Sequence, residues 1–265
     1  MLVAKLLQRL IKMINIKPVS ALTDNYIWLL QHDQQAVVID PGEAAPVLDY
    51  LATRQLHLSS IWLTHTHADH IGGVSDLKKA YPQCRVYGND HWAGVDEAVN
   101  EGSLLTCGNQ KVKVWHIPGH TTDHLAYLLQ DSINPIQVFC GDTLFSAGCG
   151  RVFTGTMAQL YDSLQRLASL PEDTLFYPAH ELTAANLHFA QAVEPHNPDI
   201  KQAMQKAGVI PTLPVSLAHE LRVNPFLRLK QPEVIAAVLA QGLTAEDAKQ
   251  PLAVFTYLRE WKNRF

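Results

Sequence analysis

The chain has 265 residues and a formal net charge of −4, with 47% apolar and 17% charged residues. The apolar share suffices for a sizeable core, and the length fits one large domain or one domain with a small addition. The slightly acidic balance offers no broad basic surface, and no apolar stretch reaches the roughly 18–20 residues of a membrane span. We therefore expect no nucleic-acid partner and no stable membrane association.

The first twelve residues form an N-terminal extension of uncertain status. Its apolar residues fall at helical spacing among basic residues, without an acidic one (Leu2, Lys5, Leu6, Leu7, Arg9, Leu10, Ile11 and Lys12). One interpretation is a short amphipathic membrane-surface or targeting helix. The other is that Met13 is the true start, and we favour the second.

Strand and helix signals alternate in the first two thirds of the chain, and helical signals dominate the rest. Apolar runs predict strands at residues 35–40, 60–63, 111–117, 125–129, 136–140 and 174–177, with helices at 46–54 and 157–170. After residue 180 the β signal ends, and helices are predicted at 184–193, 200–207, 232–239 and 244–261. We expect a catalytic domain over residues 13–182 and a small helical domain over residues 183–265.

The segment 65–70 reads HTHADH and follows an apolar run. Imidazole and carboxylate are ligands that zinc, iron and manganese accept. Alternate residues of an extended segment point the same way, so His65 and His67 can hold one ion together. Asp69 and His70 lie beyond the turn and face elsewhere, which suggests a second ion.

Three further candidate ligands also come directly after apolar strands. They are His120, Asp142 and His180. Rigid strands that end at one edge of a sheet and each present a polar residue there are typical of binding sites in layered α/β folds. The spacing therefore predicts a metal centre at such an edge.

The pattern His-x-His-x-Asp-His, followed by a distant His, Asp and His, resembles the metallo-β-lactamase superfamily. Three segments are similar to its glyoxalase II branch, the hydroxyacylglutathione hydrolases: 24–28 (DNYIW), 139–151 (FCGDTLFSAGCGR) and 258–265 (LREWKNRF). The resemblance runs from about Ile14 to the last residue. It implies an α+β fold, a four-layer αββα sandwich with a small helical C-terminal domain that binds glutathione.

The resemblance also implies the ligand set of two divalent ions, most simply Zn²⁺, with iron or manganese as alternatives. One ion is held by His65, His67 and His120, the other by Asp69, His70 and His180, and Asp142 bridges them. Asp69 and Asp142 are then the catalytic residues, around a metal-bridging hydroxide with a pKa brought toward about 7. The implied reaction converts S-D-lactoylglutathione to D-lactate and glutathione, the second step of methylglyoxal detoxification.

Glutathione carries two carboxylates, so cations should line its pocket. The resemblance points to Arg151, Arg259 and Lys262, and the spacing of the last two puts both on one helix face. Phe153 occupies a further substrate-binding position at which several relatives carry a tyrosine. Leu182 likewise replaces a tyrosine, and neither side chain can hydrogen-bond. Asp123 replaces a common glycine; its effect and the range of acyl groups stay open.

Other classes were weighed against this interpretation. A persulfide dioxygenase shares the HTHADH segment but uses one iron, and typically lacks a comparable helical domain. Other hydrolases of the fold and a non-catalytic metal-binding scaffold are less consistent with the complete ligand set. We expect His124 to support a ligand, and the other histidines to be structural or exposed (His32, His57, His91, His116, His188, His196 and His219). Reduced cysteines indicate a cytoplasmic protein, with a monomer as the default.

Overall fold

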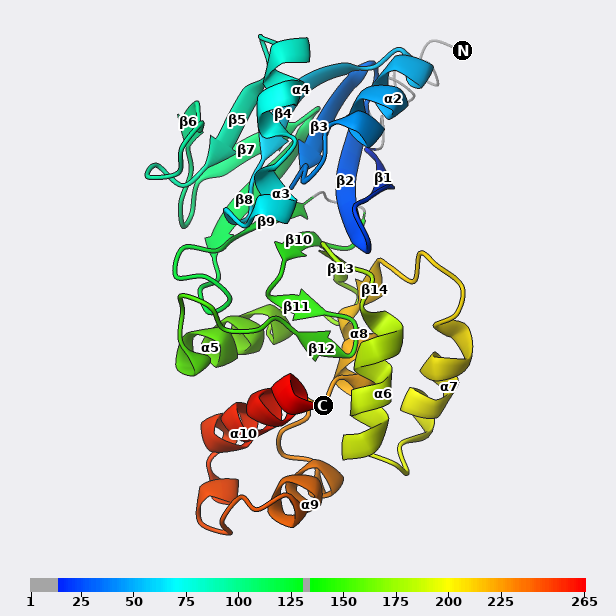
Figure 1. The fold of residues 1–265 in the computed structure, drawn as a ribbon, viewed down its shortest axis with the longest axis vertical. Helices are drawn as coiled ribbons and strands as arrows, with labels where there is room; N and C mark the ends of the chain where they lie inside the picture. Colours follow the sequence, from blue (N-terminus) through cyan, green and yellow to red (C-terminus); the bar gives the residue numbers. More distant parts are fainter. Residues whose placement is uncertain (1–13, 131–133) are drawn as a thin grey trace, which may run out of the picture. The chain divides into compact units, whose positions relative to one another are not determined.

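The computed structural model describes residues 14–130 and 134–265, so the extension over residues 1–12 lies outside the described residues. The chain forms two compact units, Met1–Val114 and Trp115–Phe265. Each combines β-structure with helices (Figure 1), as the predicted α+β class requires. Among the described residues, no helix combines the length and apolarity needed to cross a membrane.

The first unit is built on a sheet with strand order β1-β2-β3-β4-β5-β6. The strands β1 to β3 pair antiparallel and β3 to β6 pair parallel. Their bounds are β1 Asn15–Ala21, β2 Asn25–His32, β3 Gln35–Ile39, β4 His57–Trp62, β5 Arg85–Gly88 and β6 Glu97–Ala98. The helices are α2 Ala45–Arg54, α3 Ala68–Ile71 and α4 Val74–Ala80, and a hairpin joins β7 Leu104–Cys107 to β8 Gln110–His116.

The central strands of this sheet are continuous apolar runs because both of their faces are covered. Ile27, Leu29 and Val38 have no exposed surface. Helix α2 presents Val47 and Leu51, one helical turn apart, as its buried residues. Polar side chains therefore belong only at the strand ends, where the candidate ligands of this unit stand.

The second unit contains a sheet in which β9, β10, β13 and β14 lie in this order. The strands β10 and β13 run parallel, and the other two pairs are antiparallel. The bounds are β9 Leu125–Gln130, β10 Gln137–Gly141, β13 Leu175–Pro178 and β14 Val215–Ser216. A separate small hairpin joins β11 Leu144–Phe145 to β12 Gly148–Cys149.

Helix α5, Met157–Ala168, shows how the sequence specifies a helix in this unit. Thr156 and Gln159 form a capping box that satisfies backbone groups at the helix start. Leu160, Leu164 and Leu167 follow at helical spacing, and at most 1% of each is exposed. The helix is thus stabilised by one apolar stripe against the core of its unit.

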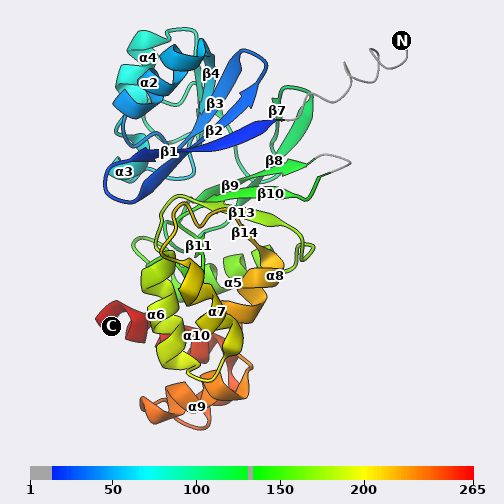
Figure 2. The same ribbon diagram turned by 90° about the vertical axis from the view of Figure 1, so that its right-hand side faces the viewer.

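The C-terminal part of the second unit is helical, as predicted. The helices are α6 Thr183–Val193, α7 Pro198–Lys206, α8 Leu217–Val223, α9 Pro232–Ala240 and α10 Pro251–Arg264. Both ribbon views show α6 to α10 gathered at one end of this unit (Figure 2). The tail residues that the sequence analysis assigned to substrate binding lie on α10.

Two predictions for this part of the chain are wrong. The single helix predicted over 244–261 is a short 3₁₀ turn, Asp247–Lys249, followed by a helix that begins at Pro251. Gln250 is extended between them, because a residue that precedes proline avoids the helical region. The β signal also does not end at residue 180, since β14 adds two residues to the sheet and leads into α8, which was not predicted.

The apolar stripe of α5 yields a stability prediction. Leu164→Ala should lower the free energy of unfolding by about 2–5 kcal/mol, because a fully buried side chain leaves a cavity that its surroundings refill only in part. Urea denaturation would measure the loss. Gln165→Ala, at the exposed neighbouring position, is the control and should change stability by less than about 0.5 kcal/mol. Equal effects of the two substitutions would contradict the assigned packing.

Candidate metal centre and cationic cleft

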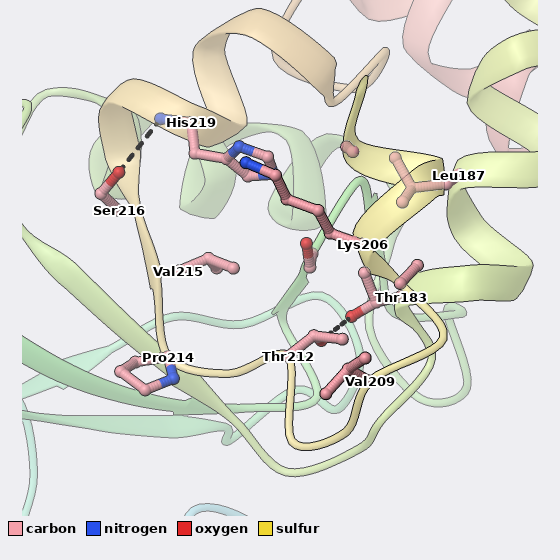
Figure 3. Close-up of a pocket in the computed structure, with 12 residues that line it drawn as sticks. Thr183, Leu187, Lys206, Val209, Thr212, Pro214, Val215, Ser216 and His219 are labelled. Carbon is pink, nitrogen blue, oxygen red and sulfur yellow. Dashed lines mark hydrogen bonds between the residues drawn. The ribbon is translucent and has the colours of Figure 1, made fainter. Parts of the chain in front are cut away.

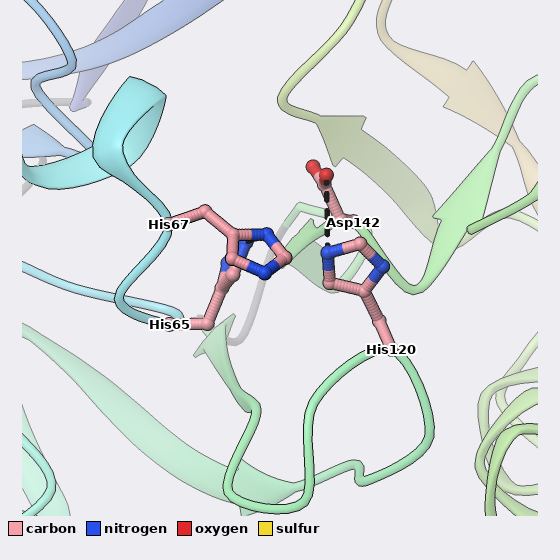
Figure 4. Close-up of side chains that lie close together, drawn as sticks. All are labelled: His65, His67, His120 and Asp142. Carbon is pink, nitrogen blue, oxygen red and sulfur yellow. Dashed lines mark hydrogen bonds and ion pairs between the residues drawn. The ribbon is translucent and has the colours of Figure 1, made fainter. Parts of the chain in front are cut away.

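In the first unit, His65 and His67 follow the end of β4 and face each other (Figure 4). His65 Nε2 lies 3.0 Å from His67 Nδ1, and His65 has no exposed surface. Two imidazole nitrogens at this separation suit a hydrogen bond and also suit two ligands of one ion. The alternation expected from the sequence therefore does bring both rings to one place.

Asp69 and His70 lie on the short helix α3, at the turn beyond the first two histidines. Asp69 Oδ2 is 3.4 Å from His70 Nε2 and accepts a hydrogen bond of 3.1 Å from Asn25 Nδ2. The carboxylate and the imidazole thus present an oxygen and a nitrogen toward each other. This donor pair suits a divalent ion that accepts oxygen and nitrogen ligands.

Asp40 supports this set and was missed as a site residue in the sequence analysis. It is 5% exposed, and it accepts hydrogen bonds of 2.7 Å from both the backbone N and Oγ1 of Thr64. Its Oδ2 is 3.1 Å from His70 Nδ1, and Thr64 Oγ1 is 3.0 Å from His65 Nδ1. Hydrogen bonds at Nδ1 orient each ring and leave Nε2 for a metal.

The polar atoms of Asp40, His65 and His70 lie within 4.8 Å of one another, which places Asp40 directly behind the two histidine rings. The signal for its role was present in the sequence, since it directly follows β3 as the other candidate ligands follow their strands. Gly42, two residues later, must be glycine, because a Cβ there would lie 1.9 Å from the carbonyl oxygen of Asp69. The two loops are thereby packed backbone to backbone.

In the second unit, Asp142 lies between two histidines. Its Oδ2 is 3.5 Å from His120 Nε2 (Figure 4), and its Oδ1 is 3.3 Å from His180 Nε2. One carboxylate oxygen thus faces each imidazole, which is the arrangement that a carboxylate shared by two ions requires. The three residues that the sequence places far apart meet because β10 and β13 are adjacent parallel strands.

Further groups orient these ligands. His120 Nδ1 is 2.8 Å from the carbonyl oxygen of Arg151, to which it donates when that nitrogen carries the proton. His120 Nε2 is then unprotonated and suited to bind a metal. His124 Nε2 accepts a hydrogen bond of 3.2 Å from the backbone N of Asp142. His124 therefore supports a candidate ligand, as expected from the sequence.

A cleft of about 500 Å³ in the second unit brings together the three cations predicted to bind substrate. Arg151 follows the β11–β12 hairpin, whereas Arg259 and Lys262 project from α10. The complete lining is Phe145, Cys149, Arg151, Leu182, Ala185, Asn186, His188, Arg259, Lys262 and Phe265. The spacing argument for α10 was therefore correct about the shared face.

Burial gives the cations of the cleft different properties. Arg259 is 3% exposed, and its Nη1 donates to the carbonyl oxygens of Cys149 at 2.7 Å and Gly150 at 3.4 Å. Lys262 is half-buried, and desolvation, reinforced by the charge of Arg259, lowers its pKa to about 8. Arg259 thus helps to build the cleft wall, and Lys262 is the more available cation.

The sequence predicted the three cations of the cleft but not most of its other lining residues, among them His188 and Phe265. His188 and Phe265 both line the cleft, with ring centroids 5.3 Å apart. Helical spacing gave no signal for them, because His188 lies six residues after Leu182 and Phe265 six residues after Arg259, about 1.7 helical turns in each case. Phe153 is not among the lining residues; its ring lies edge-on to His120 at 5.1 Å and is 61% exposed.

A second cavity of about 390 Å³ lies among α6, α7 and the segment that leads into α8 (Figure 3). Its walls are mainly apolar, including Leu187, Val209 and Val215. Thr183 and Thr212 share a hydrogen bond of 2.6 Å at its edge. The residues that line it are different from those predicted for the metal centre and the substrate.

Comparisons with known proteins identify the family of this chain. A model of the metallo-beta-lactamase superfamily matches residues 22–94, and a model described as hydroxyacylglutathione hydrolase C-terminus matches residues 181–265. The hydroxyacylglutathione hydrolase of Neisseria gonorrhoeae is 54% identical, over 94% of this chain and 99% of that protein. The one from Vibrio cholerae is 45% identical, over 96% of this chain and all of that protein.

Two solved structures share the fold. ETHE1 from Myxococcus xanthus matches with a TM-score of 0.63 at 28% identity, over 94% of this chain and 99% of that one. TTHA1623 in a di-iron-bound form matches with a TM-score of 0.59 at 26% identity, over 80% of this chain and all of that one. The structure therefore has the metallo-β-lactamase fold with a helical C-terminal region, as predicted. Within that class, the chain belongs to the hydroxyacylglutathione hydrolase family.

The role of Asp40 can be tested by metal binding alone. Asp40→Ala should weaken affinity for Zn²⁺ by about 10- to 100-fold, because His70 and, through Thr64, His65 lose the groups that orient them. Competition with a chromogenic chelator would measure the affinity. Asp49→Ala, at an exposed position on α2, is the control and should bind as tightly as the wild type. An Asp40→Ala protein with wild-type affinity would exclude the positioning role.

Proposed function

We propose that this protein hydrolyses S-(2-hydroxyacyl)glutathione thioesters, typically S-D-lactoylglutathione, to a 2-hydroxy acid and glutathione. The observation that carries the proposal is the meeting of Arg151, Arg259 and Lys262 in one cleft, in the unit that also holds the His120–Asp142–His180 set. Those cations suit the two carboxylates of glutathione. The name shared by relatives at 45–54% identity supports the same activity.

We further propose that seven residues hold two divalent ions. The first would be bound by His65, His67 and His120, the second by Asp69, His70 and His180, with Asp142 shared between them. The orientation of the imidazoles by Asp40, Thr64 and the Arg151 carbonyl supports this assignment. The donor set of imidazoles and carboxylates suits Zn²⁺, and iron and manganese accept the same ligands.

The chemistry follows from this ligand set and from the cleft. Two bound ions lower the pKa of water toward about 7 and stabilise negative charge on a thioester carbonyl oxygen. Addition of water and cleavage of the C–S bond release a carboxylic acid and the thiol of glutathione. Asp69 and Asp142 are the proposed catalytic residues, because their carboxylates would hold the ions that activate the water. Arg151 and Lys262 would orient the glutathione carboxylates, and Phe153, whose ring lies beside His120, is a further proposed substrate contact.

Arg259 contributes to this cleft in two ways. Its Nη1 is committed to the wall of the cleft through the carbonyl oxygens of Cys149 and Gly150. Its Nε is buried and has no hydrogen-bond partner among the described residues. Because that atom is not exposed to the cleft, Arg259 would act on a bound carboxylate through its charge.

We also propose that the enzyme acts as a monomer in the reducing cytoplasm, in the second step of methylglyoxal detoxification. All four cysteines are buried free thiols (Cys84, Cys107, Cys140 and Cys149). Burial raises the pKa of Cys84 to about 11 and that of Cys107 to about 12, so these thiols stay protonated and unreactive near neutrality.

The direct test is hydrolysis of S-D-lactoylglutathione by the purified protein, with the metal content determined on the same sample. We expect rapid turnover with about two ions per chain. A fully metallated protein without turnover would exclude the proposal. Oxygen consumption with glutathione persulfide would then test the dioxygenase alternative.

Asp142→Ala should abolish hydrolysis and lower the metal content below two ions per chain together, because one carboxylate would serve both ions. Steady-state kinetics and elemental analysis of the same preparation would measure both quantities. Asp162→Ala, at an exposed position on α5 in the same unit, should change neither. Retention of both ions by Asp142→Ala would show that the carboxylate is not shared.

Lys262 should make substrate affinity depend on pH. Its ammonium is charged below a pKa of about 8 and neutral above it, so KM should rise as the pH increases through about 8. Lys262→Arg keeps its charge and should have a flat KM over pH 7–9, whereas Lys262→Ala should have a KM raised by about tenfold throughout. The same rise of KM with pH in wild type and Lys262→Ala would assign the titration to another group.

A further inference from the structure

The β11–β12 hairpin lies between two parts of the candidate active site. It begins two residues after Asp142 and ends directly before Gly150 and Arg151. Its tip, Ser146–Ala147, is buried, and Ala147 has a φ of 55°, a conformation that costs energy for a residue with a Cβ. Other groups must therefore hold the tip in place.

The carboxylate of Glu220, on α8, holds both residues of the tip. Its Oε2 accepts a hydrogen bond of 2.8 Å from the backbone N of Ala147, and its Oε1 accepts one of 3.1 Å from Ser146 Oγ. Asn224 Nδ2 donates to the same Oε2 at 2.9 Å. The backbone N–H at the strained position 147 is thereby satisfied by a carboxyl oxygen.

Two asparagine side chains bind the carbonyl groups of the same hairpin. Asn224 Nδ2 donates to Gly148 O at 2.9 Å and to Phe145 O at 3.3 Å. Asn186 Nδ2, from α6, donates to Ser146 O at 3.0 Å. Asn186, Glu220 and Asn224, which we call the hairpin clamp, therefore bind a backbone group of every residue from 145 to 148.

Burying the three polar side chains of the hairpin clamp costs free energy. Asn224 and Glu220 have no exposed surface, and Asn186 is 5% exposed. Burial raises the pKa of the Glu220 carboxyl to about 7, a measure of the cost of its charge. An apolar cluster that includes Ala147 and Leu187 packs directly beside it. Buried polar groups of this kind specify one backbone geometry more sharply than apolar packing does.

That geometry is transmitted to the candidate ligands by short contacts. Gly150 lies so close to Asp142 that a Cβ would be 1.9 Å from its carbonyl oxygen. The next residue, Arg151, offers the carbonyl oxygen that orients His120. At the other end, the ring of Phe145 lies edge-on to His180 at 5.8 Å.

We propose that Asn186, Glu220 and Asn224 are positioning residues, which hold the β11–β12 hairpin so that His120, Asp142 and His180 are aligned for the reaction. The helical region would thereby act on the metal centre as well as line the cleft. This inference rests on the proposed function for its kinetic consequences. Its metal-binding consequences can be measured without any activity.

Asn186→Ala and Asn224→Ala test the inference. Each should lower kcat for S-D-lactoylglutathione by about tenfold or more, because the candidate ligands are misaligned. Asn186 and the hairpin residues Phe145 and Cys149 also line the cleft, so KM should rise as well, and Zn²⁺ affinity is the deciding measurement. Zn²⁺ affinity, from chelator competition, should fall by about tenfold in the same variants. Asn186→Ala removes a single hydrogen bond to the hairpin, so it remains informative if Asn224→Ala does not fold.

Glu220→Gln is the conservative variant. One amide oxygen can still accept from Ala147 and Asn224, and the Ser146 hydroxyl can turn to accept from the new amide nitrogen. We therefore expect kcat and Zn²⁺ affinity within about threefold of wild type, whereas Glu220→Ala should resemble Asn224→Ala. Loss of kcat in Glu220→Gln equal to that in Glu220→Ala would contradict the proposed acceptor role.

A buried ion pair in the same helical region provides the matched control. Glu194 is 2% exposed and accepts from Arg228 Nε at 2.8 Å and Nη2 at 2.9 Å. Glu194→Gln should lower the melting temperature but leave kcat and Zn²⁺ affinity at wild-type values. If kcat and Zn²⁺ affinity fell as much in this variant as in the hairpin-clamp variants, the losses would reflect general stability, and the inference would be overturned. An inactive wild-type protein would instead refute the proposed function. The Zn²⁺ affinities of the variants would then still show whether the hairpin clamp positions the metal ligands.

Discussion

The candidate metal centre depends on one constraint, which is the choice of the imidazole nitrogen that carries the proton. A neutral ring binds an ion through Nε2 when Nδ1 holds the proton, and an acceptor at Nδ1 fixes that tautomer and the orientation of the ring. The acceptor at Nδ1 of His70 is the carboxylate of Asp40, and the acceptor at Nδ1 of His65 is the hydroxyl oxygen of Thr64. That hydroxyl in turn donates a hydrogen bond to Asp40. His120 has the carbonyl oxygen of Arg151. The surrounding loops are built to supply these acceptors.

In the second unit, three cations lie close together in one cleft, and their charges must be compensated. The cleft gathers Arg151, Arg259 and Lys262, and their mutual repulsion and desolvation must be offset. Arg259 is stabilised by the carbonyl oxygens of Cys149 and Gly150. Lys262 is less well compensated, and its lowered pKa records that deficit. A ligand with two negative charges would offset both the repulsion among the cations and the cost of their desolvation. The same charges that destabilise the cleft would therefore favour binding of such a ligand.

The β11–β12 hairpin connects the candidate metal ligands of this unit to the cationic cleft. Its return strand supplies the carbonyl groups that Arg259 binds, and the residue that follows orients His120. The helices α6 and α8 hold the tip of the same hairpin through Asn186, Glu220 and Asn224. The helical region is therefore connected by hydrogen bonds to the ligand-bearing part of its unit. Deleting or exchanging it would disturb more than the substrate cleft.

The sequence by itself determined the chemistry, because ligand type and strand-end position are local properties of the chain. The HTHADH segment, His120, Asp142, His180 and the cations of the tail could all be proposed as site residues without a structure. Short elements could not be identified, since a two-residue strand such as β14 and the helix break at Gln250 depend on tertiary packing and on one proline.

Only the tertiary structure decided which groups support the site. The roles of Asp40, Asn186 and Glu220 rest on contacts with residues that are between 24 and 74 positions away in the sequence. An ordinary aspartate, asparagine or glutamate carries no local pattern that predicts its burial. The physical reason is that a buried polar side chain is defined by the partners that satisfy it, and folding alone brings those partners together.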